Sequence, residues 1–226
     1  MFVKLPTDTK IYALSAANPS ESSWGYYCSP DDVIQGKHIG SCLGDLFSIK
    51  FIEESEETDL TNENLQTQFE KIRAATTLSH VMQWGDLSYT GEPASNFIGT
   101  GASINLRKPL NKDFFNKKYS SYDSRMMKIK ILTETYKREG TKEAEREMRE
   151  EMREMQRLDD IFFHIQTELS LTGQYSPRHI NMDCMRTVME NHTQQCGRLS
   201  DYGLRYAKFY AEACETMPAE KIISAV

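Results

Sequence analysis

The second half of the chain carries a long stripe of mostly apolar positions, spaced three or four residues apart. Its members are Met148, Met152, Met155, Leu158, Phe162, Ile165, Leu169 and Thr172. This spacing places them on one face of a helix over residues 141–172, close to the seam of a coiled coil. Thr141 is suited to begin the helix as its N-cap, and Gly173 to end it. Such a stripe must be covered by another helix or by a partner, so it indicates contact surfaces more than chemistry.

Two more helices flank this stripe. One is predicted over residues 124–138, just before a glycine that can end it. The other begins at Ser176-Pro177, a hydroxyl cap followed by a first-turn proline, and continues to Met217. Gly197 weakens this last helix and is suited to a bend. The pattern predicts an antiparallel helical hairpin, with the 124–138 helix packed on it.

The first half alternates short apolar segments with turn residues. Strands are predicted for four segments, 10–14, 24–28, 97–98 and 103–106. Ser29-Pro30 resembles a helix start, and residues 41–52 suit either a buried helix or a strand. A helix is predicted over residues 61–83. The stretch 53–63 holds six acidic residues and no basic one, which indicates a solvated loop.

These elements predict an α+β fold. Residues 1–106 are expected to form a mixed α/β region with a small sheet, and residues 107–140 a basic-aromatic junction followed by a helix. Residues 141–226 are expected to form the antiparallel helical hairpin, or a bundle built on it. The two outer regions can share one core.

Charge is unevenly distributed along the 226 residues, whose net charge is −6. Residues 1–110 carry 8 basic and 14 acidic side chains, whereas residues 111–226 carry 19 of each. Global nucleic-acid binding usually needs a basic field, so the overall charge does not favour it.

The cysteines and the apolar segments bear on the compartment. The five cysteines, an odd number without framework spacing, are Cys28, Cys42, Cys184, Cys196 and Cys214. Reduced thiols are the simplest expectation. No apolar run approaches the roughly 18–20 residues that span a bilayer, and residues 1–6 do not lead into a secretory signal. We expect a cytoplasmic protein, or one in the host-cell cytosol if a pathogen exports it or a virus encodes it.

Cys42 is the leading candidate nucleophile. It lies in the segment Gly40-Ser41-Cys42, where small residues flank the thiol and an apolar segment follows. A helix N-terminus at this place would favour the thiolate. Over about ten residues the segment resembles papain-like cysteine proteases and the cysteine-protease effectors of pathogens.

That resemblance implies a later histidine, followed by an aspartate or asparagine. His164 and Asp183 stand in this order, 19 residues apart, so Cys42, His164 and Asp183 form a candidate triad. A papain-like fold would place the histidine on a strand, whereas His164 falls within the predicted 141–172 helix. The alternative is a small buried thiol, the commoner state of a free cysteine.

Metal binding is a second hypothesis for the helical half. His179 and Asp183 are four residues apart, as are His192 and Cys196, and such pairs share a helix face. The two pairs point to different sides of the helix, and two ligands are too few for one ion. Ordinary polar helix faces explain them better, so neither a metal nor a cofactor is predicted. The phosphate-binding, dinucleotide-binding, zinc-protease and serine-hydrolase motifs are absent from the sequence.

Two further groups of side chains suggest binding surfaces. Methionines adapt to varied partners, and the candidate partner-binding set is Met148, Met152, Met155, Met182, Met185 and Met189. A flexible core is the alternative. Basic residues interleaved with aromatic ones could contact phosphates or nucleic acid, and this patch holds Arg107, Lys108, Lys112, Lys117, Lys118, Arg125, Lys128 and Lys130. It could equally dock on the acidic stretch 53–63.

The leading interpretation is a binding or scaffolding protein that acts through its amphipathic helical surface. It would serve as an effector-type adaptor, as in virulence, or as an assembly subunit, with a protein partner or self-association through helices. The alternative is a cysteine-dependent hydrolase or transferase of papain-like type that uses Cys42. A third hypothesis is an RNA-binding viral or phage protein that uses residues 107–130.

Overall fold

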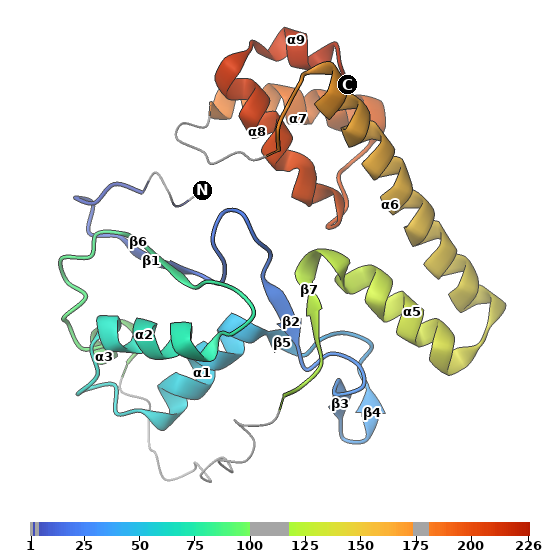
Figure 1. The fold of residues 1–226 in the computed structure, drawn as a ribbon. Helices are drawn as coiled ribbons and strands as arrows, with labels where there is room; N and C mark the ends of the chain where they lie inside the picture. The colour runs from blue at the N-terminus through green and yellow to red at the C-terminus, as the bar shows by residue number, and fades with distance from the viewer. Residues whose placement is uncertain (1, 3–4, 100–117, 174–180) are drawn as a thin grey trace. The chain divides into compact units, whose positions relative to one another are not determined.

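The computed structural model describes residues 2, 5–99, 118–173 and 181–226. The chain divides into two compact units, Met1–Met127 and Lys128–Val226, called unit 1 and unit 2 below. The boundary lies inside the predicted junction 107–140. Unit 1 holds small antiparallel sheets with helices, and unit 2 is helical, so the predicted α+β fold is confirmed (Figure 1).

The described residues of unit 1 form three small antiparallel sheets (Figure 1). Their pairings are β1 (Tyr12–Ser15) with β6 (Met82–Gly85), β2 (Trp24–Tyr26) with both β5 (Gly44–Asp45) and β7 (Ser121–Asp123), and β3 (Val33–Ile34) with β4 (Lys37–His38). The strands predicted at 10–14 and 24–28 are confirmed, although they belong to different sheets. The segment 103–106 lies outside the described residues.

Gly85, the last residue of β6, lets the backbone come close to the start of β1. It pairs with Tyr12 and has a φ of +84°, a left-handed conformation that side chains rarely adopt. A Cβ here would also lie 2.2 Å from the carbonyl oxygen of Ile11. Only glycine therefore allows the two backbones to approach so closely at this end of the sheet.

Two of the three described helices of unit 1 begin at side-chain caps. The helices are α1 (Leu46–Glu57), α2 (Leu65–Ala75) and the short α3 (Ser95–Ile98). At the start of α1 the carboxylate of Asp45 accepts from the N–H of Ser48, and at the start of α2 the amide oxygen of Asn64 accepts from that of Thr67. The helix predicted over 61–83 is shorter than expected. It ends at Ala75, and residues 82–83 belong to β6. The strand predicted at 97–98 is wrong, since these residues end α3.

Two other local predictions in unit 1 are wrong. Ser29-Pro30 does not start a helix: its peptide bond is cis, and the chain continues into the β3–β4 hairpin. The acidic stretch 53–63 is not a solvated loop. Its first five residues finish α1, and both Glu53 and Glu63 are buried. Lysines of unit 1 pair with both carboxylates, which makes their burial tolerable.

The described elements of unit 2 are all helical. They are α5 (Met127–Glu139, which follows the 3₁₀ turn Ser124–Met126), α6 (Lys142–Glu168), α7 (Met182–Cys196), the 3₁₀ turn Gly203–Tyr206, α8 (Ala207–Thr216) and α9 (Ala219–Ile223). Thr141 caps α6 as predicted, accepting from the N–H of Ala144. α7 ends at Gly197, whose φ is +87°. The last long helix is therefore split, and the C-terminal region is a bundle rather than a simple two-helix hairpin.

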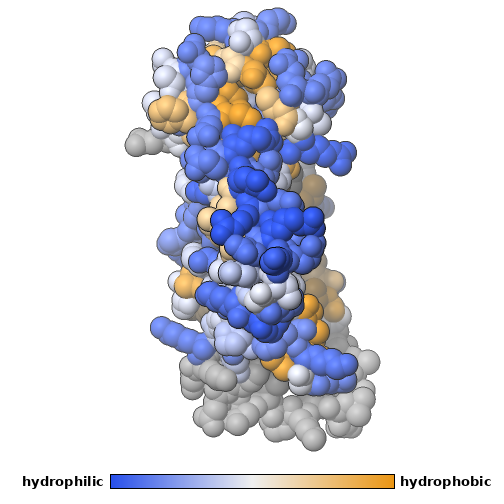
Figure 2. Space-filling model, turned by 90° about the vertical axis from the view of Figure 1, so that its right-hand side faces the viewer, coloured by the Kyte–Doolittle hydropathy of each residue, from blue (hydrophilic) through white to orange (hydrophobic). Residues whose placement is uncertain are grey.

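The stripe on α6 forms the core of unit 2 only in its second half. Leu158, Phe162 and Ile165 are fully buried, whereas Met152 is 54% exposed. The first half of α6 is solvated and carries Arg–Glu pairs at helical spacing. The face on which α6 lies is accordingly mostly hydrophilic (Figure 2). The expected coiled-coil seam along the whole helix is therefore wrong.

Candidate functional site

Cys42, the predicted nucleophile, is not a free thiol in this structure. Its sulfur is bonded to that of Cys28, and a second disulfide joins Cys184 to Cys214. Cys196 is the remaining free cysteine. The expectation of reduced thiols is therefore wrong for four of the five cysteines. A sulfur in a disulfide cannot act as a thiolate nucleophile while that bond persists.

His164 and Asp183, the other members of the candidate triad, both belong to unit 2. His164 is exposed on α6, and Asp183 on α7 has a side chain that is 95% exposed and lies 3.8 Å from Arg186. Within the described residues no hydrogen bond joins His164 to Asp183. The structure therefore gives the Cys42 hypothesis no assembled triad.

The disulfide of Cys42 closes a well-anchored loop in unit 1. Ser120 holds one side of the loop: its hydroxyl donates to the carbonyl of Cys28, and its N–H donates to the carboxylate of Asp31 at 2.7 Å. The hydroxyl of Tyr122 donates to the carbonyl of Ser29 at 2.9 Å. Residues about ninety positions apart in the sequence are thus brought together, which local patterns cannot indicate.

The same loop holds an aspartate–histidine pair. The carboxylate of Asp32 is 1% exposed, lies 2.6 Å from Nδ1 of His38 and accepts from the N–H of Gly40 at 2.9 Å. Burial raises the pKa of Asp32, but these hydrogen bonds outweigh it and hold the pKa below its ordinary value. A buried carboxylate that orients an imidazole can support proton transfer. In the described part of the chain, however, no hydroxyl or thiol is hydrogen-bonded to this ring.

Unit 1 also contains a concave apolar pocket of about 720 Å³. Its walls come from β1, α1, α2 and α3, and the principal apolar side chains are Tyr12, Leu14, Phe47, Phe51, Leu65 and Phe97. Tyr89 joins two walls, because its ring stacks on Phe97 at 5.9 Å and meets Tyr12 edge-on at 6.5 Å. A pocket of this size and polarity can receive apolar side chains of a ligand.

Two carboxylates interact in unit 1: the half-buried Glu54 on α1 and the buried Glu63, which precedes α2. Lys71 bridges them, with Nζ 2.5 Å from Oε1 of Glu63 and 3.4 Å from Oε1 of Glu54. Burial and the neighbouring Glu54 raise the pKa of Glu63. Burial also raises the pKa of Glu54, but hydrogen bonds from Glu63, Thr58 and Gln68 lower it overall. The pair is therefore suited to share a proton.

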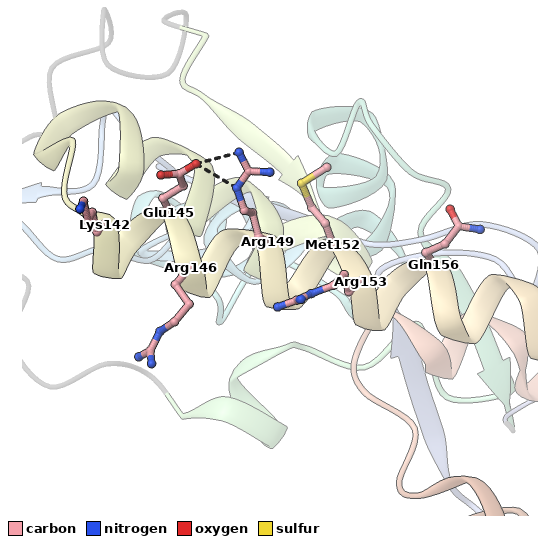
Figure 3. A pocket seen from close by; sticks show the side chains of 7 residues that line it. All are labelled: Lys142, Glu145, Arg146, Arg149, Met152, Arg153 and Gln156. Atoms are coloured by element: carbon pink, nitrogen blue, oxygen red, sulfur yellow. Dashed lines mark hydrogen bonds and ion pairs between the residues drawn. The ribbon is translucent and has the colours of Figure 1, made fainter.

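The predicted methionine clusters do not gather into one groove. Met148, Met155, Met185 and Met189 are half-buried within unit 2, and Met152 and Met182 are exposed. A hollow of about 650 Å³ follows α6 beside Met152. In Figure 3 every lining side chain stands on this one helix, and Arg149 turns toward Glu145. One helix face encloses no ligand, so the hollow is not a built site.

The basic patch can be followed only in part. Arg107, Lys108, Lys112 and Lys117 lie outside the described residues, while Lys118, Arg125, Lys128 and Lys130 lie inside them. Two of these already have partners. Arg125 donates to the carbonyl of Glu21 at 2.6 Å, and Lys128 pairs with the carboxylate of Glu151 at 2.5 Å. Their role in binding nucleic acid stays a prediction.

The described ranges contain neither a cluster of metal-binding side chains nor a membrane-spanning helix. No three His, Cys, Asp or Glu side chains gather there as a cation would require. Of the predicted pairs, His179 lies outside the described residues, and His192 is buried against Tyr210. In those same ranges no helix combines the length and apolarity needed to cross a bilayer.

Known proteins resemble this chain over all or part of its length. Residues 1–100, within unit 1, match the sequence model of the Peptidase C13 family. A vacuolar-processing enzyme of Vicia sativa is 30% identical over 98% of this chain and 50% of its own length. Those of Ricinus communis and Arabidopsis thaliana (the delta isozyme) are 27% and 28% identical. The chain spans about half the length of these curated relatives.

These similarities change the order of the functional hypotheses. They support the class of cysteine hydrolases, which was the alternative, better than a binding or scaffolding role. The interpretation as a coiled-coil effector in virulence is wrong, because the relatives are named as processing enzymes. The sequence patterns placed this class second, and the cysteine on which they based it, Cys42, is in a disulfide.

Proposed function

We propose that this chain forms part of a cysteine peptidase of the Peptidase C13 type. The observation that carries the proposal is the match of residues 1–100 to that family, together with relatives named as vacuolar-processing enzymes. In this proposal unit 1 belongs to the peptidase framework, and its apolar pocket helps to receive apolar side chains of a polypeptide.

The proposal assigns Cys42 a structural role. Peptide hydrolysis by cysteine needs a thiolate within reach of a base, and Cys42 has its sulfur in a bond to Cys28. The bond instead closes the loop that carries the Asp32–His38 pair and the β3–β4 hairpin. Holding this loop in one conformation is a role that a disulfide suits.

We further propose that the protein works in an oxidising compartment. Its two disulfides support this location, because such bonds persist in secretory and related compartments and are rare in the cytosol. Mass spectrometry of protein isolated from its natural source, with its thiols blocked before lysis, should find both disulfides. Free Cys28 and Cys184 in that sample would instead favour the cytosol.

The peptidase proposal is tested on protein isolated from its natural source with an antibody against this chain. The sample is incubated with a mixture of synthetic peptides, and cleavage is read by mass spectrometry. We expect cleavage that an alkylating reagent abolishes, since alkylation blocks thiolates. Absence of cleavage, or cleavage that alkylation leaves intact, would overturn the proposal.

The role of Cys42 is tested by a matched pair of variants. Cys42→Ala and Cys28→Ala remove the same disulfide, but the second leaves the Cys42 thiol in place. We expect both to lower the free energy of unfolding by about 3 kcal/mol, the usual effect of opening a loop of this length, and to change peptide cleavage equally. Loss of cleavage in Cys42→Ala alone would restore Cys42 as the nucleophile.

A further inference from the structure

A row of basic side chains follows the solvent-exposed face of α6. All of its members are exposed, and the set, called the basic row below, is Lys142, Arg146, Arg149, Arg153 and Arg157. At 3.6 residues per turn, their spacing confines them to an arc of about 80° and a length of about 22 Å. No other Lys or Arg residue lies on α6, so this helix gathers its positive charge on one face.

The buried side of α6 lies opposite the basic row. Leu158 and Phe162, which belong to the core of unit 2, lie about 140–180° away from the middle of the row around the helix axis. Acidic residues border the row, with Glu145 on one side, Glu150 on the other and Asp160 at its C-terminal end. Four of the five cations can be followed along the helix in Figure 3. The positive charge is thus confined to a narrow strip of the surface.

The basic row keeps charge available for a partner. Arg146, Arg149 and Arg157 each pair with a glutamate of their own helix. The side chains of Arg146 and Arg149 nevertheless stay 60% and 66% exposed, and exposed pairs of this kind are weak. Lys142 and Arg153 have no ion-pair partner among the described residues. An external anion can therefore replace the glutamates and reach the two remaining cations.

The surroundings of the basic row favour a narrow and linear partner. The whole chain has a net charge of −6, so its overall field repels anions and any attraction must be local. A flat anionic membrane would also meet the acidic borders of the row, whereas a thin chain lying along α6 would meet its cations. Nucleic-acid bases are held by stacking on aromatic rings, and residues 142–157 include none.

We propose that the basic row binds a linear polyuronate, a polysaccharide whose sugars carry carboxylates. A guanidinium binds a carboxylate through two parallel N–H donors. Arg157 already does so with Glu154, at 2.7 and 2.8 Å. Carboxylates repeated along one polymer can occupy several cations, and every contact after the first is intramolecular. Such binding would hold the protein on an acidic polysaccharide matrix. The inference concerns unit 2 and does not rest on the proposed peptidase activity.

Binding of the whole chain to fluorescently labelled polygalacturonate tests the proposal. Anisotropy is followed near pH 7, where uronate carboxylates are ionised, at low and at physiological salt. We expect saturable binding that weakens as salt is added, because the contacts are exposed ion pairs. Unlabelled polygalacturonate should compete. Monomeric galacturonate at the same carboxylate concentration should not, since separate anions gain nothing from one another.

A matched pair of double variants locates the binding surface. Arg149→Gln with Arg153→Gln removes two charges from the middle of the basic row. Arg186→Gln with Lys208→Gln removes two exposed charges from α7 and α8. We expect the first variant to bind polygalacturonate at least about fivefold more weakly, and the second to stay within about twofold of wild type. Circular dichroism should show the same helix content in both, because exposed substitutions rarely destabilise.

The outcomes that would overturn the proposal are distinct. Absence of binding by the wild-type chain, or equal weakening in the two variants, would show that the basic row is not a polyuronate site. Polyglutamate, a single-stranded oligonucleotide and phosphatidylserine vesicles serve as alternative ligands, and tighter binding of any of them would make the polyuronate assignment wrong. If the first variant loses helix, Arg153→Gln alone replaces it, because this side chain has no ion pair to lose in the described structure. Unchanged binding in that variant would equally overturn the proposal.

Discussion

The two units bury ionisable groups that respond to pH in opposite directions. Unit 1 buries Glu63 beside Glu54, and their interaction favours the protonated form of Glu63. Unit 2 buries His192 among aromatic rings, and its surroundings favour the neutral form. Acid therefore favours the folded state of unit 1 at Glu63 and disfavours the folded state of unit 2 at His192. At these two residues, a change of pH therefore acts on the two units in opposite directions.

The cores that surround these groups also differ. In unit 1 the surroundings of Glu63 are polar, with Lys71 between two carboxylates. Unit 2 relies on stacked rings around Phe162, with Tyr206 at 4.7 Å and Tyr210 at 5.4 Å. Both tryptophans, Trp24 and Trp84, lie in unit 1. Tryptophan fluorescence therefore reports on unit 1 alone, and the two units can be measured separately.

Removing the central ring of unit 2 should have the largest effect. Phe162→Ala deletes a side chain that is 1% exposed, so we expect the free energy of unfolding of unit 2 to fall by about 3–5 kcal/mol. Far-ultraviolet circular dichroism would show the loss of helix. The tryptophan signal of unit 1 should keep its own transition.

The neighbouring position provides the control for Phe162. Phe163 is 73% exposed, and Phe163→Ala should change stability by less than about 0.5 kcal/mol. If Phe162→Ala shifted the tryptophan transition as much as the helical one, the separation into two independent cores would be wrong.

Asp159 should have an intermediate effect in the same unit. Its carboxylate accepts from the hydroxyls of Tyr202, at 2.6 Å, and of Tyr206. Burial and this carboxylate raise the pKa of both tyrosines, so both stay protonated as donors. Asp159→Asn weakens two charge-assisted bonds and should cost about 1–2 kcal/mol, measured from the urea midpoint of the helical signal.

Asp160 is a suitable control for this change. It accepts from Gln156 on an exposed face of α6. Asp160→Asn should therefore leave the urea midpoint nearly unchanged. Equal shifts for the two variants would mean that the tyrosine hydroxyls contribute nothing specific.

Glu63 should give the smallest effect, and one with a defined sign. Because folding raises its pKa, its favourable contribution is present at low pH and is lost as pH rises through the folded pKa. Glu63→Gln should make the free energy of unfolding less dependent on pH. It should change that free energy near pH 8 by about 1 kcal/mol or less. Urea unfolding followed by tryptophan fluorescence, near pH 5 and near pH 8, measures it.

The exposed Glu70 of α2 serves as the matched control for Glu63. Glu70→Gln should leave the pH dependence of unit 1 as it is. A variant Glu63→Gln with unchanged pH dependence would show that Lys71 already neutralises Glu63 fully. The contrast between the units would then rest on His192 alone.

Local signals predicted the helices well. Thr141 begins α6, and α5 ends just before Gly140 because a left-handed residue there stops it. These features depend on residues within one turn of each other. The apolar period then predicted Phe162 as a core position for the same reason.

Features that depend on distant partners could not be predicted. Ser29-Pro30 has the composition of a helix start. Here, however, the N–H of Ser120 donates to the carboxylate of Asp31 and holds this segment in a non-helical conformation. The Cys28–Cys42 bond depends on where β2 and β5 pair, not on spacing. His192 was interpreted as part of a polar helix face because the rings that bury it come from α6 and α8.

Each disulfide spans a segment that a protease could cut without separating the pieces. The Cys184–Cys214 bond encloses residues 185–213, and the Cys28–Cys42 bond encloses the hairpin at 33–38. A nick inside either segment would leave one covalent molecule of unchanged mass apart from added water. Such molecules would migrate as one band until reductant is added, so a chain that has been cut and one that has not would look alike.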